Sequence, residues 1–401
     1  SDGVIPSNEG RGYVLRKIMR RGLRHGKLLG QKGSFFHRIT NKVIDDFRGA
    51  YPELNSNRDF IQKVVTNEEE SFGNTLHFGT QRLDEILEKV RKEKLTAIPG
   101  EEIFKLYDTY GFPTDLIEET AKDAGLVLDM EGYNRAMNEQ KTKAMASWKG
   151  SGEKEVASFY KEFLQTSPPT LFEGYGTTQG EGQVIAILKG TTPVESACSG
   201  DEIEFLTDKT PFYGESGGQV GDSGQAFNEN VQLELQDATK PLPGLTVHKA
   251  KVIQGTLHAK DTLTLRVNKQ TRGDTALNHS ATHLLHAALK EVLGEHIKQA
   301  GSLVAPNRLR FDYTHFSALT NKEKIRIESR VNEKIRENIQ VSTNEMDIDT
   351  AIKEGAMALF GEKYGETVRV VNVPGFSKEL CGGTHVTATG DIGLFRITSE
   401  G

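Results

Sequence analysis

Two distant segments carry the side chains best suited to binding a metal ion. The segment LNHSATHLLHAAL holds His279, His283 and His286, and spacings of four and three place all three imidazoles on one face of a helix. The segment ELCGGTHV repeats the four-residue spacing with Cys381 and His385, here in a glycine-rich loop. One thiolate and three imidazoles form a tetrahedral ligand set that suits zinc.

These segments predict one zinc ion per chain. The predicted ligands are His279, His283, Cys381 and His385. Gly382 and Gly383 would let the loop turn tightly, whereas His286 shares the helix face without being needed as a ligand. Histidines at helical spacing are also common as ordinary core or surface residues, and that alternative stays open. A zinc peptidase or amidase is disfavoured, because its helix carries a glutamate directly after the first histidine and Ser280 stands there instead.

The bulk composition limits the class of protein. A length of 401 residues suggests two or three domains, and 36% hydrophobic with 26% charged residues is typical of a globular protein. Two cysteines form no disulfide framework, which favours a reducing, cytoplasmic setting. The apolar runs are shorter than the roughly 20 residues that a membrane helix needs. The net charge of −6 means that any nucleic-acid site is a local patch.

The periodicity of the chain predicts three successive parts. Residues 1–165 follow helical patterns and form an expected all-α domain. Residues 166–267 alternate in strand fashion between Gly, Asp and Pro turns, which predicts a small β-barrel. Residues 268–401 mix helices and strands and carry the candidate zinc ligands, so we expect an α+β domain there.

A basic face on the first predicted helix suggests a contact with phosphates. Arg16, Arg20 and Arg24 line one face, and no acidic residue occurs within residues 10–44. A helix face exposed only to water usually mixes charges of both signs, so this pattern favours a phosphate-binding surface. A merely solvated face remains the alternative.

Longer motifs resemble one enzyme family along essentially the whole chain. NHSATHLLH, CGGTH and TPFYGESGGQVGD resemble the editing module of the alanyl-tRNA synthetase family. NEGRGYVLRKIMRRGLRHG and LYDTYGFPTDL resemble the tRNA-recognition part of its bacterial form. Nothing resembles the class II aminoacylation core, so we expect no ATP site. The chain is therefore expected to be a monomeric fragment of a longer ligase, cut from its aminoacylation core and its C-terminal domain.

The resemblance implies roles for particular residues. The family reads a G·U pair in the tRNA acceptor stem with an Asn and an Asp, which match Asn8 and Asp108. The implied tRNA-binding residues are Asn8, Asp108, Arg11, Arg16, Arg20 and Arg24. The four predicted ligands match the zinc ligands of the family. The implied catalytic residues are Thr282, Gln299 and Gln219.

The implied activity is proofreading. An alanine pocket cannot exclude glycine and rejects serine weakly, so a second site that hydrolyses Ser-tRNA(Ala) and Gly-tRNA(Ala) restores accuracy. The full-length protein would ligate alanine to tRNA(Ala) with ATP. Because four protein ligands close a zinc ion to water, we expect zinc to organise the pocket. A tRNA-binding scaffold with an inactive editing site is the alternative of a different class.

Overall fold

The computed structural model describes residues 3–8, 10–147, 158–358 and 365–401. The chain divides into two compact units, residues 1–152 and 153–401, and each is described by itself. Among the described residues, no helix combines the length and the apolar character needed to cross a membrane.

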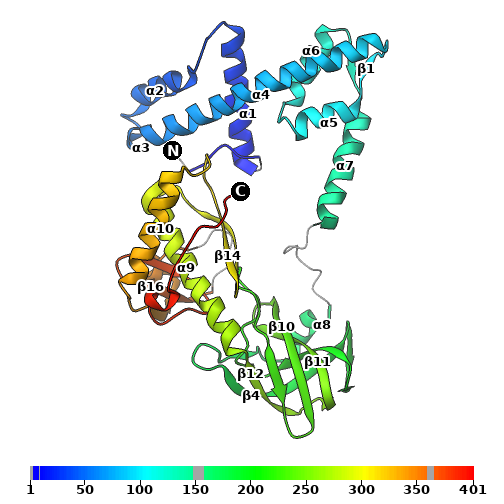
Figure 1. The fold of residues 1–401 in the computed structure, drawn as a ribbon, viewed down its shortest axis with the longest axis vertical. Helices are drawn as coiled ribbons and strands as arrows, with labels where there is room; N and C mark the ends of the chain where they lie inside the picture. The colour runs from blue at the N-terminus through cyan, green and yellow to red at the C-terminus, as the bar shows by residue number, and fades with distance from the viewer. Residues whose placement is uncertain (1–2, 9, 148–157, 359–364) are drawn as a thin grey trace. The chain divides into compact units, whose positions relative to one another are not determined.

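The first unit is helical apart from one pair of very short strands (Figure 1). Its elements are α1 (Gly10–Leu28), α2 (Phe36–Phe47), α3 (Pro52–Ser56), α4 (Arg58–Lys92), β1 (Ala97–Ile98), α5 (Gly100–Asp108), α6 (Thr114–Asp123), β2 (Val127–Leu128) and α7 (Met130–Ser147). The sequence predicted helices alone here. The strands β1 and β2 pair in parallel between Ile98 and Leu128, where two loop segments meet over the core.

The long helix α4 is the centre of the first unit. Its apolar face, with Leu83, Ile86 and Val90, is buried against α5 and α6. Two acids of its polar turn NEEES are also buried, because Glu68 and Glu69 are only 5% and 6% exposed. Buried carboxylates are costly unless they are hydrogen-bonded or paired. These two acids therefore mark contacts that hold neighbouring helices in place.

Glu69 serves as the N-terminal cap of α2 from a different helix. Its carboxylate accepts hydrogen bonds from the backbone amides of Phe35 (2.8 Å) and Phe36 (3.1 Å) and from the hydroxyl of Ser34 (2.7 Å). The residue before α2 is a phenylalanine, which cannot cap the helix itself. An acid placed at a helix N-terminus satisfies the unpaired amides and the positive end of the helix dipole.

The predicted β-barrel is confirmed in the second unit. Strands β10, β9, β12, β4, β7 and β11 form a closed ring of six, because β11 also pairs with β10. The strands of this region are β3 (Leu171–Phe172), β4 (Gln179–Lys189), β5 (Thr192–Val194), β6 (Ser196–Cys198), β7 (Glu202–Thr207), β8 (Lys209–Thr210), β9 (Gly224–Phe227), β10 (Val231–Leu242), β11 (Leu245–His258) and β12 (Thr262–Val267). The short strand β9 was missed from the sequence, yet it links β10 to β12.

A short helix, α8 (Ser158–Thr166), lies against the barrel. Tyr160 and Phe163 pack with Leu188, Leu206 and Leu245. The helix therefore belongs physically to the second unit. The predicted domain boundaries after residues 165 and 267 stay predictions.

The rest of the second unit is a mixed α and β region that follows the barrel directly (Figure 1). It contains α9 (Lys269–Leu293), β13 (Gln299–Ala305), β14 (Arg308–Tyr313), α10 (Asn321–Arg336), β15 (Ser342–Asp347), α11 (Ile348–Lys353), β16 (Thr367–Val373), β17 (Ser377–Leu380) and a 3₁₀ turn at Thr389–Ile392. Leu284, Ala288 and Leu289 of α9 pack against Ile327 and Val331 of α10. That contact fixes the rotation of α9 and so the direction in which its histidines face.

A buried arginine fastens the start of α9 to the barrel. Arg272 pairs with Asp222 through Nε at 2.9 Å and donates to the carbonyls of Gly174 and Pro211, each at 2.8 Å. The pair is 6% and 5% exposed. A buried pair in which all three guanidinium nitrogens have acceptors is well suited to fixing one geometry, whatever its net stability. The barrel loops are thereby held beside α9.

Candidate metal centre

Helix α9 supplies two of the four predicted ligands. Asn268 caps the helix by accepting from the amides of Gln270 and Thr271. Four turns of uninterrupted helix then bring His279 and His283 onto one buried face, with ring centroids 5.4 Å apart. The four-residue spacing therefore produces the adjacency that the sequence predicted.

The loop after β17 supplies the other two ligands. Cys381 Sγ lies 3.4 Å from His279 Nε2 and 3.4 Å from His385 Nε2. One candidate ligand atom from each of the four residues lies within 4.8 Å of the others. Tetrahedral zinc with bonds of about 2.0–2.3 Å needs ligand atoms separated by roughly 3.3–3.8 Å. The donor set and the two distances from Cys381 therefore fit a zinc ion.

Burial keeps these imidazoles neutral, and only a neutral imidazole can bind a metal ion. Loss of solvent, together with the neighbouring His283, lowers the pKa of His279 to about 3. Burial likewise lowers the pKa of His283 and holds that of His385 well below its ordinary value. A neutral imidazole has a lone pair for a cation, so protons do not compete for these three imidazoles near neutral pH.

A glutamine from the barrel sets the orientation of His279. Gln219 is fully buried, and its Oε1 lies 2.7 Å from His279 Nδ1 and 2.9 Å from the amide nitrogen of Thr384. An amide oxygen only accepts, so Nδ1 carries the proton and Nε2 keeps its lone pair toward Cys381. Gln219 Nε2 also donates to Thr384 Oγ1 at 3.0 Å. Gln219 thus orients His279 from outside the ligand set, as the hydrogen-bond partner of a metal-binding histidine does.

Two further polar groups flank the ligands. Ser280 Oγ lies 3.1 Å from His385 Nδ1 and accepts from the amide of Val386. Burial alone would raise the pKa of Glu379, but the facing His283 and His286 and the hydroxyl of Ser377 hold it below its usual range. Glu379 Oε1 lies 3.1 Å from His286 Nδ1, so His286 contacts this carboxylate instead of joining the ligand cluster.

Residues that the sequence analysis missed hold the cysteine loop. Arg369 Nη1 donates to the carbonyls of Cys381 (3.0 Å) and Gly383 (2.8 Å), and the Tyr175 hydroxyl donates to the carbonyl of Gly382 (2.6 Å). The Arg369 guanidinium lies 4.1 Å from the centre of the Tyr175 ring. Neither residue falls in a metal motif, so only their contacts reveal them.

The double glycine of the loop has a steric reason. A Cβ on Gly383 would lie 2.0 Å from the ring of His279. Any side chain at that position would push His279 away from Cys381. The glycine predicted to allow a tight turn is therefore required chiefly by the close approach of the ligand.

A small cavity of about 70 Å³ opens beside His279, His283 and Cys381. Thr282 and Gln299, two of the predicted catalytic residues, line it together with Ser216, Gly217 and Ser302. The third, Gln219, does not line it and lies behind His279. The Thr282 hydroxyl donates to the carbonyl of Asn278, and Gln299 Nε2 donates to Ser302 Oγ at 3.3 Å.

The glycine-rich motif of the barrel reaches this cavity. Gly217 and Gly218 have φ angles of 59° and 84°, which favour glycine, and a Cβ on Gly218 would lie 2.2 Å from Ser302 Oγ. The amide of Val304 donates to the carbonyl of Gly218 at 2.7 Å. The loop thus pairs with β13 and forms one wall of the cavity.

The predicted tRNA-binding residues all lie in the first unit. Asn8, Arg11 and Asp108 are exposed, and Asp108 is the last residue of α5. The predicted basic face is neutralised by acids from other helices, because Arg16 and Arg20 pair with Glu68. Arg24 likewise pairs with Glu119 of α6. Sequence distance hid these partners, and a phosphate-binding role for the three arginines stays a prediction.

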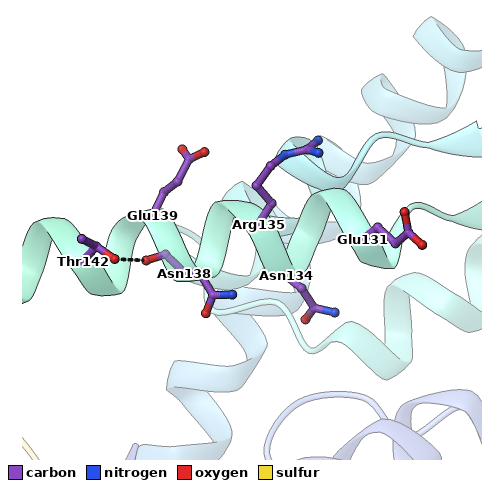
Figure 2. A pocket seen from close by; sticks show the side chains of 6 residues that line it. All are labelled: Glu131, Asn134, Arg135, Asn138, Glu139 and Thr142. Atoms are coloured by element: carbon purple, nitrogen blue, oxygen red, sulfur yellow. Dashed lines mark hydrogen bonds between the residues drawn. The ribbon is translucent and has the colours of Figure 1, made fainter.

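A second depression, on α7, lacks the features of a site. It is lined by Glu131, Asn134, Arg135, Asn138, Glu139 and Thr142, which come from one helix and point in different directions (Figure 2). The drawn contact runs from the Thr142 hydroxyl to the Asn138 carbonyl and is internal to the helix. Such side chains form a solvated helix face.

Comparison with known proteins agrees with the motifs. The family model described as tRNA synthetases class II (A) matches residues 1–271, and the threonyl and alanyl tRNA synthetase second additional domain matches residues 368–401.

Curated relatives match along the entire chain. The chain is 46% identical over 401 residues to the alanine–tRNA ligase of Oleidesulfovibrio alaskensis, covering 100% of this chain and 46% of that protein. It is 48% identical over 399 residues to that of Desulfosudis oleivorans, with 45% of that protein covered. It is 49% identical over 401 residues to that of Xanthomonas oryzae pv. oryzae, again covering 45%. The chain thus spans slightly less than half the length of these relatives, and it belongs to the alanine–tRNA ligase family.

Proposed function

We propose that this chain recognises tRNA(Ala) and hydrolyses Ser-tRNA(Ala) and Gly-tRNA(Ala), as the proofreading part of an alanine–tRNA ligase. The observation that carries the proposal is the cluster of His279 and His283, which are buried, with Cys381 and His385, which are partly buried, beside a cavity lined by hydroxyl and amide groups. The whole protein would attach alanine to tRNA(Ala) at the expense of ATP.

The proposed metal is zinc, one ion per chain. One thiolate with three imidazoles is the chemistry that selects zinc over the harder magnesium and calcium ions. When bound, zinc supplies a fixed positive charge at the wall of the cavity. Gln219 and Ser280 hold the rings of His279 and His385, so the ligand geometry is set before any substrate enters.

The cavity favours the ester of a small amino acid. Its volume of about 70 Å³ suits a glycyl or seryl group and little more. Thr282 and Gln299 would meet the amino acid, because their polar groups lie at the cavity wall. Gly217 and Gly218 would let the backbone approach the terminal ribose closely. These residues exclude bulk water from the bond to be cleaved and orient its carbonyl.

The proposed tRNA contact is in the first unit. Asp108 would accept from the exocyclic amine of guanine, and Asn8 would donate to a base edge of the G·U pair. Arg11 is exposed and suited to a phosphate. Arg16, Arg20 and Arg24 would add charge to the same surface while remaining paired with acids.

Deacylation assays test the proposal. The purified chain with zinc is incubated with Ser-tRNA(Ala), Ala-tRNA(Ala) and a small peptide. We expect hydrolysis of the seryl ester to exceed that of the alanyl ester, no cleavage of the peptide, and loss of activity after treatment with a chelator. Thr282→Val and Gln299→Ala should change the seryl-to-alanyl ratio.

Two outcomes would overturn the proposal. Hydrolysis of the peptide in place of the seryl ester would favour a zinc peptidase, against which Ser280 argues because the helix lacks the required glutamate. Tight binding of tRNA(Ala) without any deacylation would favour a binding scaffold.

A further inference from the structure

Glu68 of α4 binds two arginines of α1 at once. Its carboxylate accepts from Arg20 Nε at 2.7 Å and from Arg16 Nε at 3.2 Å, and Glu68 is only 5% exposed. A carboxylate removed from water must be compensated by hydrogen bonds or by charged partners, and here the two arginines supply both. Glu68 therefore fixes the separation of two guanidinium groups that sequence spacing alone would leave free to move.

Each arginine reaches beyond Glu68 to a different segment. Arg16 Nη1 donates to Asn8 Oδ1 at 2.5 Å, and its Nη2 lies 3.3 Å from the carbonyl of Pro6. Arg20 Nη1 lies 3.4 Å from the carbonyl of Gly111, in the turn that follows Asp108. The guanidinium groups of Arg16 and Arg20 therefore contact the two segments that carry the proposed base-reading residues.

The contact with Arg16 also sets which way the Asn8 amide faces. A guanidinium only donates, so it selects the amide oxygen and turns Nδ2 away. Nδ2 can then donate to an acceptor on a base edge, while the Asp108 carboxylate accepts from the exocyclic amine of guanine. One donor and one acceptor suit the two bases of a pair only if they are held at the separation that the pair requires.

The turn after Asp108 is positioned in a similar way. The amide of Gly111 donates to the carbonyl of Tyr107 at 3.1 Å, which closes the turn at the end of α5. Arg20 lies with its guanidinium carbon 5.2 Å from the centre of the buried Phe72 ring, one turn along α4 from Glu68. The arginine is thus held by a carboxylate and a ring from α4 while it contacts the turn.

We propose that Glu68 is a positioning residue for recognition of the G·U pair. By holding Arg16 and Arg20 together, it sets the distance between Asn8 and the turn that directly follows Asp108. This inference rests on the proposed function, since it requires those two residues to read the pair. Hydrogen bonds weaken steeply outside a narrow range of distance and angle, so a small change in this spacing costs discrimination.

The neighbouring Glu69 provides a matched control. It is similarly buried, on the same helix, and its hydrogen bonds go to Ser34, Phe35 and Phe36. Loss of either carboxylate removes a buried acid and its hydrogen bonds, and both changes should lower the melting temperature. Only the loss of Glu68 should alter the choice between base pairs.

The experiment measures binding of the full chain to two acceptor-stem RNA hairpins that differ only in having G·U or G·C at the recognised pair. The readout is the dissociation constant of the G·C hairpin divided by that of the G·U hairpin, both measured by fluorescence anisotropy. We expect Glu68→Gln to reduce this ratio by about fivefold or more, the lower range for one good base contact. Glu69→Gln should leave the ratio unchanged. A ratio that Glu68→Gln leaves at the wild-type value would overturn the inference.

Further variants provide a test if Glu68→Gln does not fold. They also distinguish failure of the proposed base-pair recognition from failure of the positioning role alone. Arg16→Lys keeps the charge but cannot span Glu68 and Asn8 together, so it should lower the ratio and decides the question if Glu68→Gln does not fold. Glu68→Gln combined with Asn8→Ala should lose little more than Asn8→Ala alone. If Asn8→Ala and Asp108→Ala leave the ratio unchanged, the proposed recognition fails, and the inference with it. If they lower it while Glu68→Gln and Arg16→Lys do not, only the positioning role fails.

Discussion

The candidate metal centre and the proposed recognition surface place polar side chains in opposite environments. Near Cys381, His279 and His283 are buried, and burial lowers the pKa of His279 to about 3. In the first unit, Asn8 and Asp108 are exposed, and the buried group is Glu68, one step behind them. Imidazoles that bind a cation must be unprotonated, which burial favours, whereas groups that meet a hydrated polyanion must stay in water.

Each of the two regions nevertheless contains one buried polar residue that bonds to groups on two separate segments, here called a connector. Gln219 joins His279 of α9 to Thr384 of the cysteine loop, and Glu68 joins two arginines that reach different loops. The connector is an amide where its partners are neutral and a carboxylate where they are cations. Its charge thus follows from the charge of the groups that it must hold.

The largest expected effect is on metal binding. Cys381→Ala should lower zinc affinity by more than about 100-fold, because loss of an outer partner alone costs about 10–100-fold and the thiolate is itself a ligand. Zinc content by elemental analysis and competition with a chelator would measure it. The control, Cys198→Ala, changes an exposed cysteine and should keep one zinc per chain. Full zinc retention in Cys381→Ala would remove the proposed site.

His248 is a buried histidine outside the ligand cluster, so it tests the effect of burial on stability without any contribution from metal binding. His248 lies in the barrel, accepts from Thr210, and has its pKa lowered by burial to about 4. The unfolded chain takes up its proton near pH 6.5, so stability is complete above that pH and is lost as the pH falls toward 4. The loss should be about 3 kcal/mol.

Urea unfolding of the metal-free protein at pH 7 and pH 4 would test this. Wild type should lose about 3 kcal/mol more between the two pH values than His248→Gln does. His258→Gln, which alters an exposed histidine, should behave as wild type. If the free energy of unfolding depended on pH equally in wild type and His248→Gln, the His248 imidazole would not be the source of the stability loss.

The connector of the metal centre should have a smaller effect than a ligand. Gln219→Ala leaves the four ligands in place but removes the group that orients His279, so zinc affinity should fall by about 10–100-fold. Chelator competition measures this, and the exposed Gln225→Ala is the control. Unchanged affinity in Gln219→Ala would mean that helix packing alone orients the histidine.

The smallest effect is expected on the exposed surface. Asp108→Ala should weaken discrimination of G·U from G·C by about 1–3 kcal/mol, the usual worth of a good base contact, without changing the preference for seryl over alanyl esters. Deacylation of both esters on both tRNA variants measures the two preferences separately. Asp123→Ala, an exposed acid on α6, is the control. A changed ester preference in Asp108→Ala would show that the two units do not separately select the tRNA and the amino acid.

Local spacing in the sequence determined much of this protein. The four-residue spacings in HSATH and CGGTH predicted two pairs of zinc ligands; the structure brings the four residues together, and zinc binding stays a prediction. Strand alternation predicted the barrel, which the structure confirms. The family resemblance is also confirmed. Such inferences succeed because helical and strand periods decide which neighbouring side chains share a face.

Only the tertiary structure decided which segments meet. Gln219 lies 60 residues before His279, and Glu68 lies 48 residues after Arg20, so no local period relates them. The arginine face of α1 looked free of acids in sequence because its partners are on α4 and α6. Burial of apolar faces chooses the packing of helices and strands, and polar residues caught in that packing must find partners there, whatever their distance along the chain.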